Sequence, residues 1–253
     1  MNRRSFLHFA STGAGLSCLA PLHVRRTHHL ILIGGCGGVR KRDYYENPKL
    51  CPNFYRLTSE AFVFEEDHCE RVASHSMAFL ELLQGRENRA GKTYPTILDY
   101  VGNGVTTDSI RSIPWILQRF RPRVVVCREA EHDVGHDSYE KYLSAVRLTD
   151  QAIGLLFDWV KHHPGFSSRT AIVFRPEFGR DDEVNAHGQL HHSYGFYDTH
   201  RVASIFWGPD FNRGVDRKTV VSALDMAPTL ARIFGVEATE AQGRILPGLF
   251  RTT

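Results

Sequence analysis

The sequence predicts an α/β protein with a mostly parallel central sheet and helices on both of its faces, which makes three layers. Short apolar runs alternate with amphipathic segments along the chain. This alternation is typical of parallel sheets, whose successive strands are joined by helices. The 253 residues, 42% of them hydrophobic and 23% charged, allow one domain with a sizeable core.

Five short apolar runs are predicted strands. The clearest are residues 28–34 (HHLILIG), which end in glycine, and residues 123–127 (RVVVC). Residues 61–64, 170–174 and 202–207 have the same character. Continuous apolar runs without alternation are typical of strands that are buried on both faces.

Three amphipathic segments are predicted helices. One spans residues 73–83 and stops at Gly85, and another spans residues 226–234. The longest begins after Ser138, a suitable N-cap, and ends at residues 163–165 (HPG). Its inner stripe consists of apolar and small side chains at helical spacing: Tyr142, Val146, Thr149, Ile153, Leu156 and Val160.

Residues 1–22 resemble a twin-arginine signal peptide. Arg3 and Arg4 precede Ser-Phe-Leu, and the mildly apolar stretch that follows is diluted by glycine, serine and threonine. The stretch is too short and too polar to span a membrane. We therefore expect delivery by the twin-arginine export machinery, no transmembrane span in the mature form, and a periplasmic or secreted bacterial protein. The alternative is a frayed terminus with two chance arginines.

Charge and cysteine content narrow the class of partner. The net charge is +3, and loss of Arg3 and Arg4 with the leader would leave about +1, which argues against a nucleic-acid partner. The cysteines form no CxxC metal pattern, and Cys51 with Cys69 is a candidate disulfide in an oxidising compartment. The 14 histidines fit either metal or proton chemistry or a His-rich surface.

Two polar clusters directly follow predicted strands, at the edge where parallel sheets gather their sites. In the first, Asp133 and His136 lie on a tight glycine-containing loop and could share one cation; the alternative is a polar surface loop. In the second, Glu177 could be a metal ligand, a general base, or the ion-pair partner of Arg175 or Arg180.

Two further clusters supply candidate ligands and nucleophiles. Adjacent histidines rarely point the same way, so at most one of His191 and His192 is expected in a site. Ser74 and Ser76 stand at the start of a predicted helix, where the positive field favours anions. Either serine could be a nucleophile, and the alternative is an N-cap.

In their order along residues 28–250, these features resemble the alkaline phosphatase/sulfatase superfamily. The most specific motif is D-x-A-P-T-L, which follows a GP…G turn. Glu177-Phe178-Gly179-Arg180 further resembles a twin-arginine-exported branch with an EFGR motif. The segments that carry the resemblance are Gly38-Val39-Arg40, Cys51 to Leu57, Gln84-Gly85-Arg86, Asp133 to His136, Trp207-Gly208-Pro209 and Asp225 to Leu230.

The resemblance implies an alkaline phosphatase-like three-layer fold and an exported, metal-dependent hydrolase of a phosphate or sulfate ester. It implies one divalent cation (zinc, manganese or calcium) held by Asp133, His136 and either His191 or His192. The implied substrate is a small anionic ester or a sulfated or phosphorylated glycan.

The chain departs from the family pattern at three places. Gly37 replaces the aspartate that follows the first strand, and Glu177-Phe178 replaces an Asp-His pair of ligands. The sulfatase nucleophile signature C-x-P-x-R is missing, and His75 falls near its place. These changes imply a partly degenerate metal site. The alternative function is therefore a non-catalytic relative that binds an anionic or glycan ligand.

Overall fold

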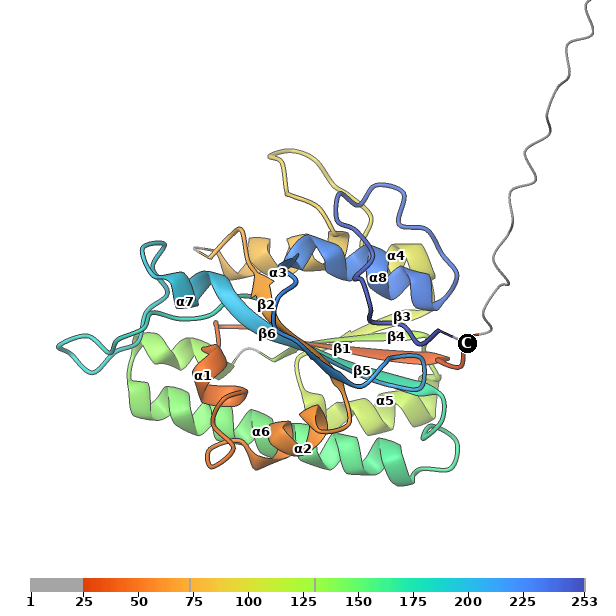
Figure 1. Ribbon diagram of the computed structural model, residues 1–253, viewed down its shortest axis with the longest axis horizontal. Coiled ribbons are helices and arrows are strands. Elements are labelled where there is room, and N and C mark those ends of the chain that lie inside the picture. Colours follow the sequence, from red (N-terminus) through yellow and green to blue (C-terminus); the bar gives the residue numbers. More distant parts are fainter. Residues whose placement is uncertain (1–24, 73, 130, 253) are drawn as a thin grey trace, which may run out of the picture.

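The computed structural model describes residues 25–72, 74–129 and 131–252. A twisted sheet forms the middle layer, with helices above and below it, so the predicted three-layer α/β fold is confirmed (Figure 1). The predicted leader, residues 1–22, lies outside the described residues. None of the described helices is long and apolar enough to cross a membrane.

The central sheet has eight strands in the order β3-β4-β1-β5-β6-β2-β7, with β8 paired to β2. Only β6 runs antiparallel to its neighbours, β5 and β2, among the described strands, so the sheet is mostly parallel as predicted. The strands are β1 (His29–Gly35), β2 (Phe62–His68), β3 (Gly104–Thr107), β4 (Val124–Glu129), β5 (Thr170–Pro176), β6 (Arg201–Trp207), β7 (Gly214–Asp216) and β8 (Val221–Ser222).

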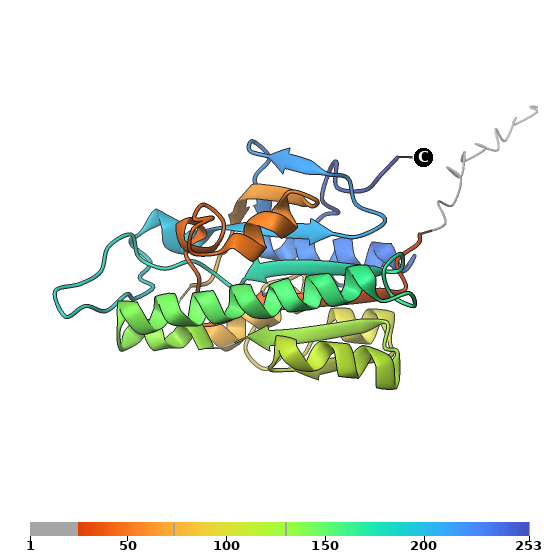
Figure 2. The ribbon, with the colours of Figure 1, turned by 90° about the horizontal axis from the view of Figure 1, so that it is seen from below.

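Helices divide between the two faces of the sheet (Figures 1 and 2). One face carries α3 (His75–Gln84), α4 (Ile97–Val101) and α8 (Met226–Ile233); the other carries α1 (Lys41–Tyr44), α2 (Pro52–Thr58), α5 (Ile113–Phe120) and the long α6 (Tyr139–His162). The short α7 (Tyr197–His200) precedes β6. The three 3-10 turns are η1 (Ile110–Ser112), η2 (Glu131–His136) and η3 (Ala223–Asp225).

Two apolar cores lie on opposite faces of the sheet, because strand side chains alternate between them. On β1, Ile31 and Ile33 join the core under α6, whereas Leu30 and Leu32 join the core under α3 and α8. Every residue of β1 after His29 is buried. This explains the continuous apolar run of the sequence. The six residues of the predicted inner stripe of α6 are all buried, as predicted.

The predicted Cys51–Cys69 disulfide is wrong. Both thiols are free and buried, Cys51 in the core under α6 and Cys69 in a separate small cluster near the end of β2. Burial raises the pKa of the Cys69 thiol to about 12, so it stays protonated near neutral pH.

Candidate metal centre

Four side chains from three segments converge at the carboxyl ends of the parallel strands. Asp133 and His136 lie on η2, directly after β4. His75 is the first residue of α3, and His192 lies in the long loop after β5. Each offers one ligand atom, and the four atoms lie within 4.8 Å of one another.

The contacts inside this cluster join ring nitrogens and one carboxylate oxygen. Oδ1 of Asp133 lies 3.2 Å from Nε2 of His75 and 3.5 Å from Nε2 of His136. Nε2 of His136 lies 2.9 Å from Nε2 of His192. The Asp133 side chain is 58% exposed, so the cluster is open to solvent on this side.

Hydrogen bonds behind two of the rings fix which nitrogen faces the cluster. His192 donates from Nδ1 to the carbonyl oxygen of Val72 at 2.7 Å, which leaves the lone pair of the neutral ring on Nε2. His75 donates from Nδ1 to the carboxylate of Glu177, and its Nε2 likewise faces inward. Metal-binding histidines are commonly oriented by such an outer hydrogen bond.

Burial favours the uncharged form of two cluster histidines, His192 and His136. The pKa of His192 falls to about 4, first because the ring is buried and then because of its neighbours His75 and Arg180. Burial, followed by the charge of Arg180, also lowers the pKa of His136. Neutral imidazoles are the form that binds metal ions.

Arg180 ties together the loops that carry the cluster. Its guanidinium is fully buried and donates to the carbonyl oxygens of Gly38 at 3.0 Å and His132 at 2.9 Å, and also to those of Gly37 and Leu190. These carbonyls belong to the loop after β1, to η2, and to the loop that leads to His192. One side chain thus holds three loops in register.

The residues present fit a divalent cation. Three imidazole nitrogens and one carboxylate oxygen form a donor set that zinc accepts in proteins. Two of the imidazoles have their other nitrogen occupied by a hydrogen bond, so their orientation is set before any ion binds. His75, Asp133, His136 and His192 are the residues that would hold the ion.

Several predicted site residues take different places around this cluster. Asp133, His136 and His192 belong to it, whereas Glu177 is fully buried behind His75. His191 contacts His136 from outside the cluster, Nδ1 to Nδ1 at 2.8 Å. Among the described contacts, Glu177 forms no ion pair with Arg175, which is paired with Asp67 at 2.8 Å.

The two serine candidates flank the cluster at the start of α3. Ser74 is the N-cap of α3 but forms no side-chain cap hydrogen bond, and Ser76 is exposed on the first turn. His75, which lies between them, is the member of the cluster that the sequence reasoning left without a role. Its place near the missing nucleophile signature was the signal that could have identified it.

Two positions where the sequence resemblance implies metal ligands are filled in a compatible way. Gly37 has a φ of +92°, and a Cβ there would lie 2.8 Å from the carbonyl carbon of His132 and closer still to the amide nitrogen of Asp133. Phe178 is fully buried, and its ring centroid lies 4.9 Å from that of His75 and 4.8 Å from that of His192. Position 37 therefore has no room for a carboxylate, and position 178 supplies an apolar wall.

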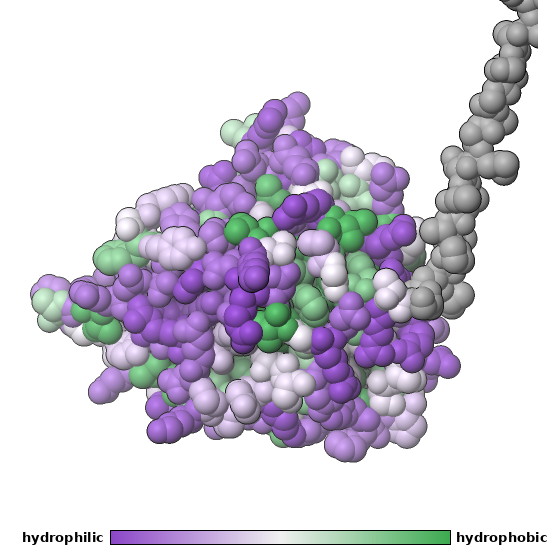
Figure 3. Space-filling model, in the orientation of Figure 1, coloured by the Kyte–Doolittle hydropathy of each residue, from purple (hydrophilic) through white to green (hydrophobic). Residues whose placement is uncertain are grey.

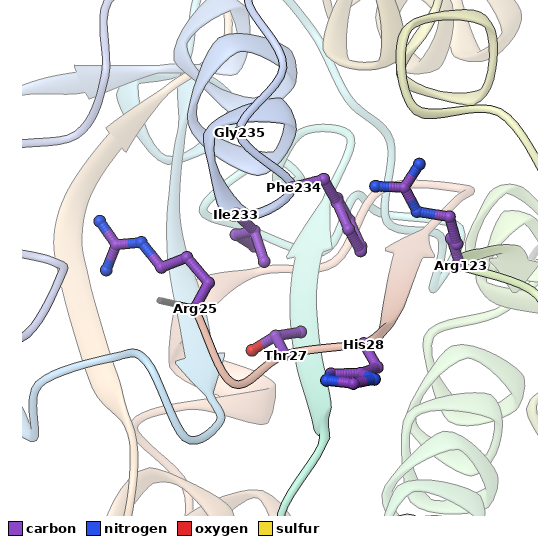
Figure 4. A pocket seen from close by; sticks show the side chains of 7 residues that line it. All are labelled: Arg25, Thr27, His28, Arg123, Ile233, Phe234 and Gly235. Atoms are coloured by element: carbon purple, nitrogen blue, oxygen red, sulfur yellow. The ribbon is translucent and has the colours of Figure 1, made fainter. Parts of the chain in front are cut away.

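A pocket lies at the opposite edge of the sheet from the cluster. The loops around the cluster present a largely hydrophilic surface, at the left of the face that Figure 3 shows. At the other edge, near the starts of β1 and β4, Arg25, Thr27, Arg123 and Phe234 line a pocket of about 520 Å³ (Figure 4). Its two guanidiniums lie apart, on opposite sides of the pocket, and sites of open α/β sheets lie at the carboxyl edge instead.

Comparison with solved structures shows that the chain shares its fold with sulfatases. A predicted sulfatase from Bacteroides thetaiotaomicron VPI-5482 has a TM-score of 0.67 at 11% identity, over 87% of this chain and 74% of that one. BT4656, solved in complex with its substrate D-glucosamine-2-N,6-O-disulfate, has a TM-score of 0.64 at 11% identity, over 88% and 79%. BT1596, a 2-O GAG sulfatase, has a TM-score of 0.62 at 10% identity, over 84% and 71%. No protein-family model matches the chain, and no curated protein matches it.

Proposed function

We propose that this chain is a metal-dependent hydrolase of a sulfate or phosphate ester, with one divalent cation held by His75, Asp133, His136 and His192. The observation that carries the proposal is the convergence of these four ligand atoms within 4.8 Å at the carboxyl edge of the sheet. The sulfatase-like fold supports the reaction class. Fold alone does not determine a reaction, so the weight rests on the cluster.

The residues around the cluster have separable roles in this proposal. A divalent cation held there would neutralise charge on the ester oxygens and help to activate water. Glu177 holds the His75 ring through Nδ1 and is itself held by the backbone N–H of Gly37 at 2.7 Å. His191, 2.8 Å behind His136, is placed to exchange a proton with it.

The proposed substrate is an anionic ester on a sugar, and the proposed setting is outside the cytoplasm. A sugar disulfate is the substrate of BT4656, whose fold is similar. The exposed carboxylate of Asp133 leaves the cluster accessible to a ligand of this size. Export rests on the twin-arginine motif at Arg3 and Arg4.

A non-catalytic relative that binds an anionic or glycan ligand is the second candidate. It is favoured by Gly37, where no side chain fits, and by Ser76, which is exposed and for which the described residues supply no hydrogen-bonded base. Such a protein would keep the cation and bind an ester without turning it over.

Metal content and turnover, measured together, test the proposal. Mature protein would be analysed by inductively coupled plasma mass spectrometry and assayed on p-nitrophenyl sulfate, phosphate and phosphodiester. We expect about one equivalent of zinc, manganese or calcium, and loss of both metal and turnover in Asp133→Ala. Asp137→Ala is the matched control, because Asp137 is 65% exposed and makes only a long 3.8 Å ion pair with Lys141.

The outcomes separate the candidates. Bound metal without turnover of any ester would favour the non-catalytic relative. Wild-type protein that contains no metal, or Asp133→Ala protein with unchanged metal content, would refute the centre.

A further inference from the structure

The pocket at the amino edge of the sheet is lined by two arginines and by no described carboxylate (Figure 4). Its volume of about 520 Å³ lies within the range of small-ligand sites. Arg25 and Thr27 precede β1, and Arg123 immediately precedes β4. Ile233 is the last residue of α8, and Phe234 follows it. The pocket is thus built by the starts of two strands and the end of one helix, away from the metal centre.

Neither guanidinium of the pocket is neutralised by an ion pair with a described residue. Asp210 is the acid that acts on Arg25, but its carboxylate is buried and accepts from the backbone N–H groups of Arg26 at 3.0 Å and Thr27 at 2.8 Å. Burial lowers the pKa of Arg25; Asp210 opposes this shift and Arg232 adds to it. A partly buried cation of this kind is stabilised by an incoming anion.

Two buried polar atoms at the Arg25 end of the pocket lack a hydrogen-bond partner among the described residues. One is Oγ1 of Thr27, a residue that is 5% exposed, and the other is Nη1 of Arg25. The Thr27 hydroxyl lies on the side of this residue that faces Arg25 (Figure 4). Buried polar groups are nearly always paired, so two such donors on neighbouring residues indicate that this end of the pocket takes an acceptor.

The two guanidiniums are held apart by separate contacts. That of Arg25 lies over the ring of Phe250, 4.3 Å from the centroid, and that of Arg123 lies over the ring of Phe234 at 4.8 Å. Arg123 also donates from Nη1 to the carbonyl oxygen of Val101 at 2.8 Å, and its other donors are left for a ligand. Because the guanidiniums lie on opposite sides of the pocket, one small anion cannot bind both (Figure 4).

We propose that this pocket binds an organic dianion, which has an apolar body and an anionic group at each end. One anionic group binds at Arg25 and Thr27, the other binds at Arg123, and the body packs on Ile233 and Phe234 between them. A small inorganic anion would engage one guanidinium only, and an uncharged apolar ligand would engage neither. This inference does not depend on the proposed hydrolase, because the pocket shares no residue with the metal centre.

The test compares dicarboxylates with monocarboxylates. Titration calorimetry would measure the binding of linear dicarboxylates, from succinate to sebacate, and of monocarboxylates of the same chain lengths. The protein would be metal-free, so that no carboxylate binds a cation at the cluster. We expect at least one dicarboxylate to bind about tenfold more tightly than its monocarboxylate, because it engages a second charged group. Arg25→Gln and Arg123→Gln should each lose this preference.

Arg119→Gln is the matched control for the general charge of this edge. Arg119 is exposed in the last turn of α5, close to the start of β4, and does not line the pocket. This variant should bind the dicarboxylate as the wild type does. Thermal melting would check that each variant is folded. Arg25→Gln is the safer of the two pocket variants, because Arg123 also holds the backbone at Val101.

The outcomes decide the inference whether or not the protein hydrolyses an ester. A preference for a dicarboxylate that is lost in folded Arg25→Gln protein and kept in Arg119→Gln supports the pocket. Three results overturn it: no dicarboxylate binds, dicarboxylates and monocarboxylates bind equally, or Arg119→Gln loses as much affinity as Arg25→Gln. The last result would mean that only the general positive charge of the edge attracts the ligand.

Discussion

Replacement of Arg180 by lysine should weaken metal binding, and by more than the accompanying loss of protein stability explains. The guanidinium donates to four backbone carbonyls from three loops and is completely buried. Lysine keeps the positive charge, but its ammonium group is a single point with three donors and cannot reproduce a planar fork. With three donors on one atom, lysine leaves at least one of the four carbonyls without a partner, and because the four lie around a planar fork we expect two to lose theirs.

The cost follows from those lost partners. A buried acceptor left without a hydrogen bond costs about 1.5 kcal/mol, so two of them amount to about 3 kcal/mol. For a chain of this length, that corresponds to a fall in the melting temperature of about 6–12 °C. Because the freed carbonyls include that of His132, next to Asp133, the ligand loop should also move.

Chemical denaturation of the metal-free protein and a zinc titration would measure the two effects separately. Arg175→Lys is the matched control, because Arg175 is equally buried but donates to no ligand residue. Its partners are the Asp67 carboxylate, Sγ of Cys69 and the backbone carbonyls of His68, Pro176 and Glu177. We expect both variants to lose stability and only Arg180→Lys to lose zinc affinity, by about tenfold or more.

Two results would refute this reasoning. One is Arg180→Lys protein whose free energy of unfolding stays within about 0.5 kcal/mol of the wild type, since that is the scatter of ordinary surface substitutions. The other is an equal loss of zinc affinity in both variants, which would mean that stability alone controls the site.

Three further predictions test the loop geometry, a buried histidine and the leader. Gly37→Ala should cost about 3 kcal/mol of stability, because alanine is strained at φ +92° and its Cβ meets the backbone of Asp133; an unchanged urea midpoint would contradict this. Burial lowers the pKa of His132 to about 4 in the folded protein, so as the pH falls the unfolded chain is protonated at this residue before the folded chain is. The free energy of unfolding of the metal-free protein should therefore drop by about 3 kcal/mol between pH 6.5 and 4. The variant His132→Gln should lack this pH dependence. Arg3→Lys combined with Arg4→Lys should leave the precursor in the cytoplasm, as measured by cell fractionation, and normal export would point to another route.

The sequence predicted the central layer well because burial on both faces leaves a strong signal. β1, β4, β5 and β6 appear where continuous apolar runs predicted them. The predicted strand at residues 61–64 was too short, since β2 continues through two glutamates to Asp67 and His68. Asp67 is tolerated there because Arg175 from β5 pairs with it in the core, a tertiary contact that no local pattern reveals.

The site was harder to predict than the fold. The order of motifs led to Asp133, His136 and a downstream histidine, and the structure brings these together. The sequence could not show that His75 and Glu177 are partners, because they are 102 residues apart. The sequence also could not show that Arg180 holds the loops together. Its four acceptors are backbone carbonyls, which every residue has, so the residue types at these positions give no signal.

The residues at the positions where the resemblance implies ligands complement one another, which fits the proposed metal centre. The same oxygen of Glu177 accepts from the backbone N–H of Gly37 and from Nδ1 of His75. A side chain at position 37 would collide with the loop that carries Asp133, so the glycine is a condition for that loop's present path. A buried carboxylate without any partner would cost several kcal/mol, so these two bonds to Oε1 stabilise Glu177 in the position from which it orients His75. Phe178 packs against His75 and His192, and the product is a cluster of three imidazoles and a carboxylate.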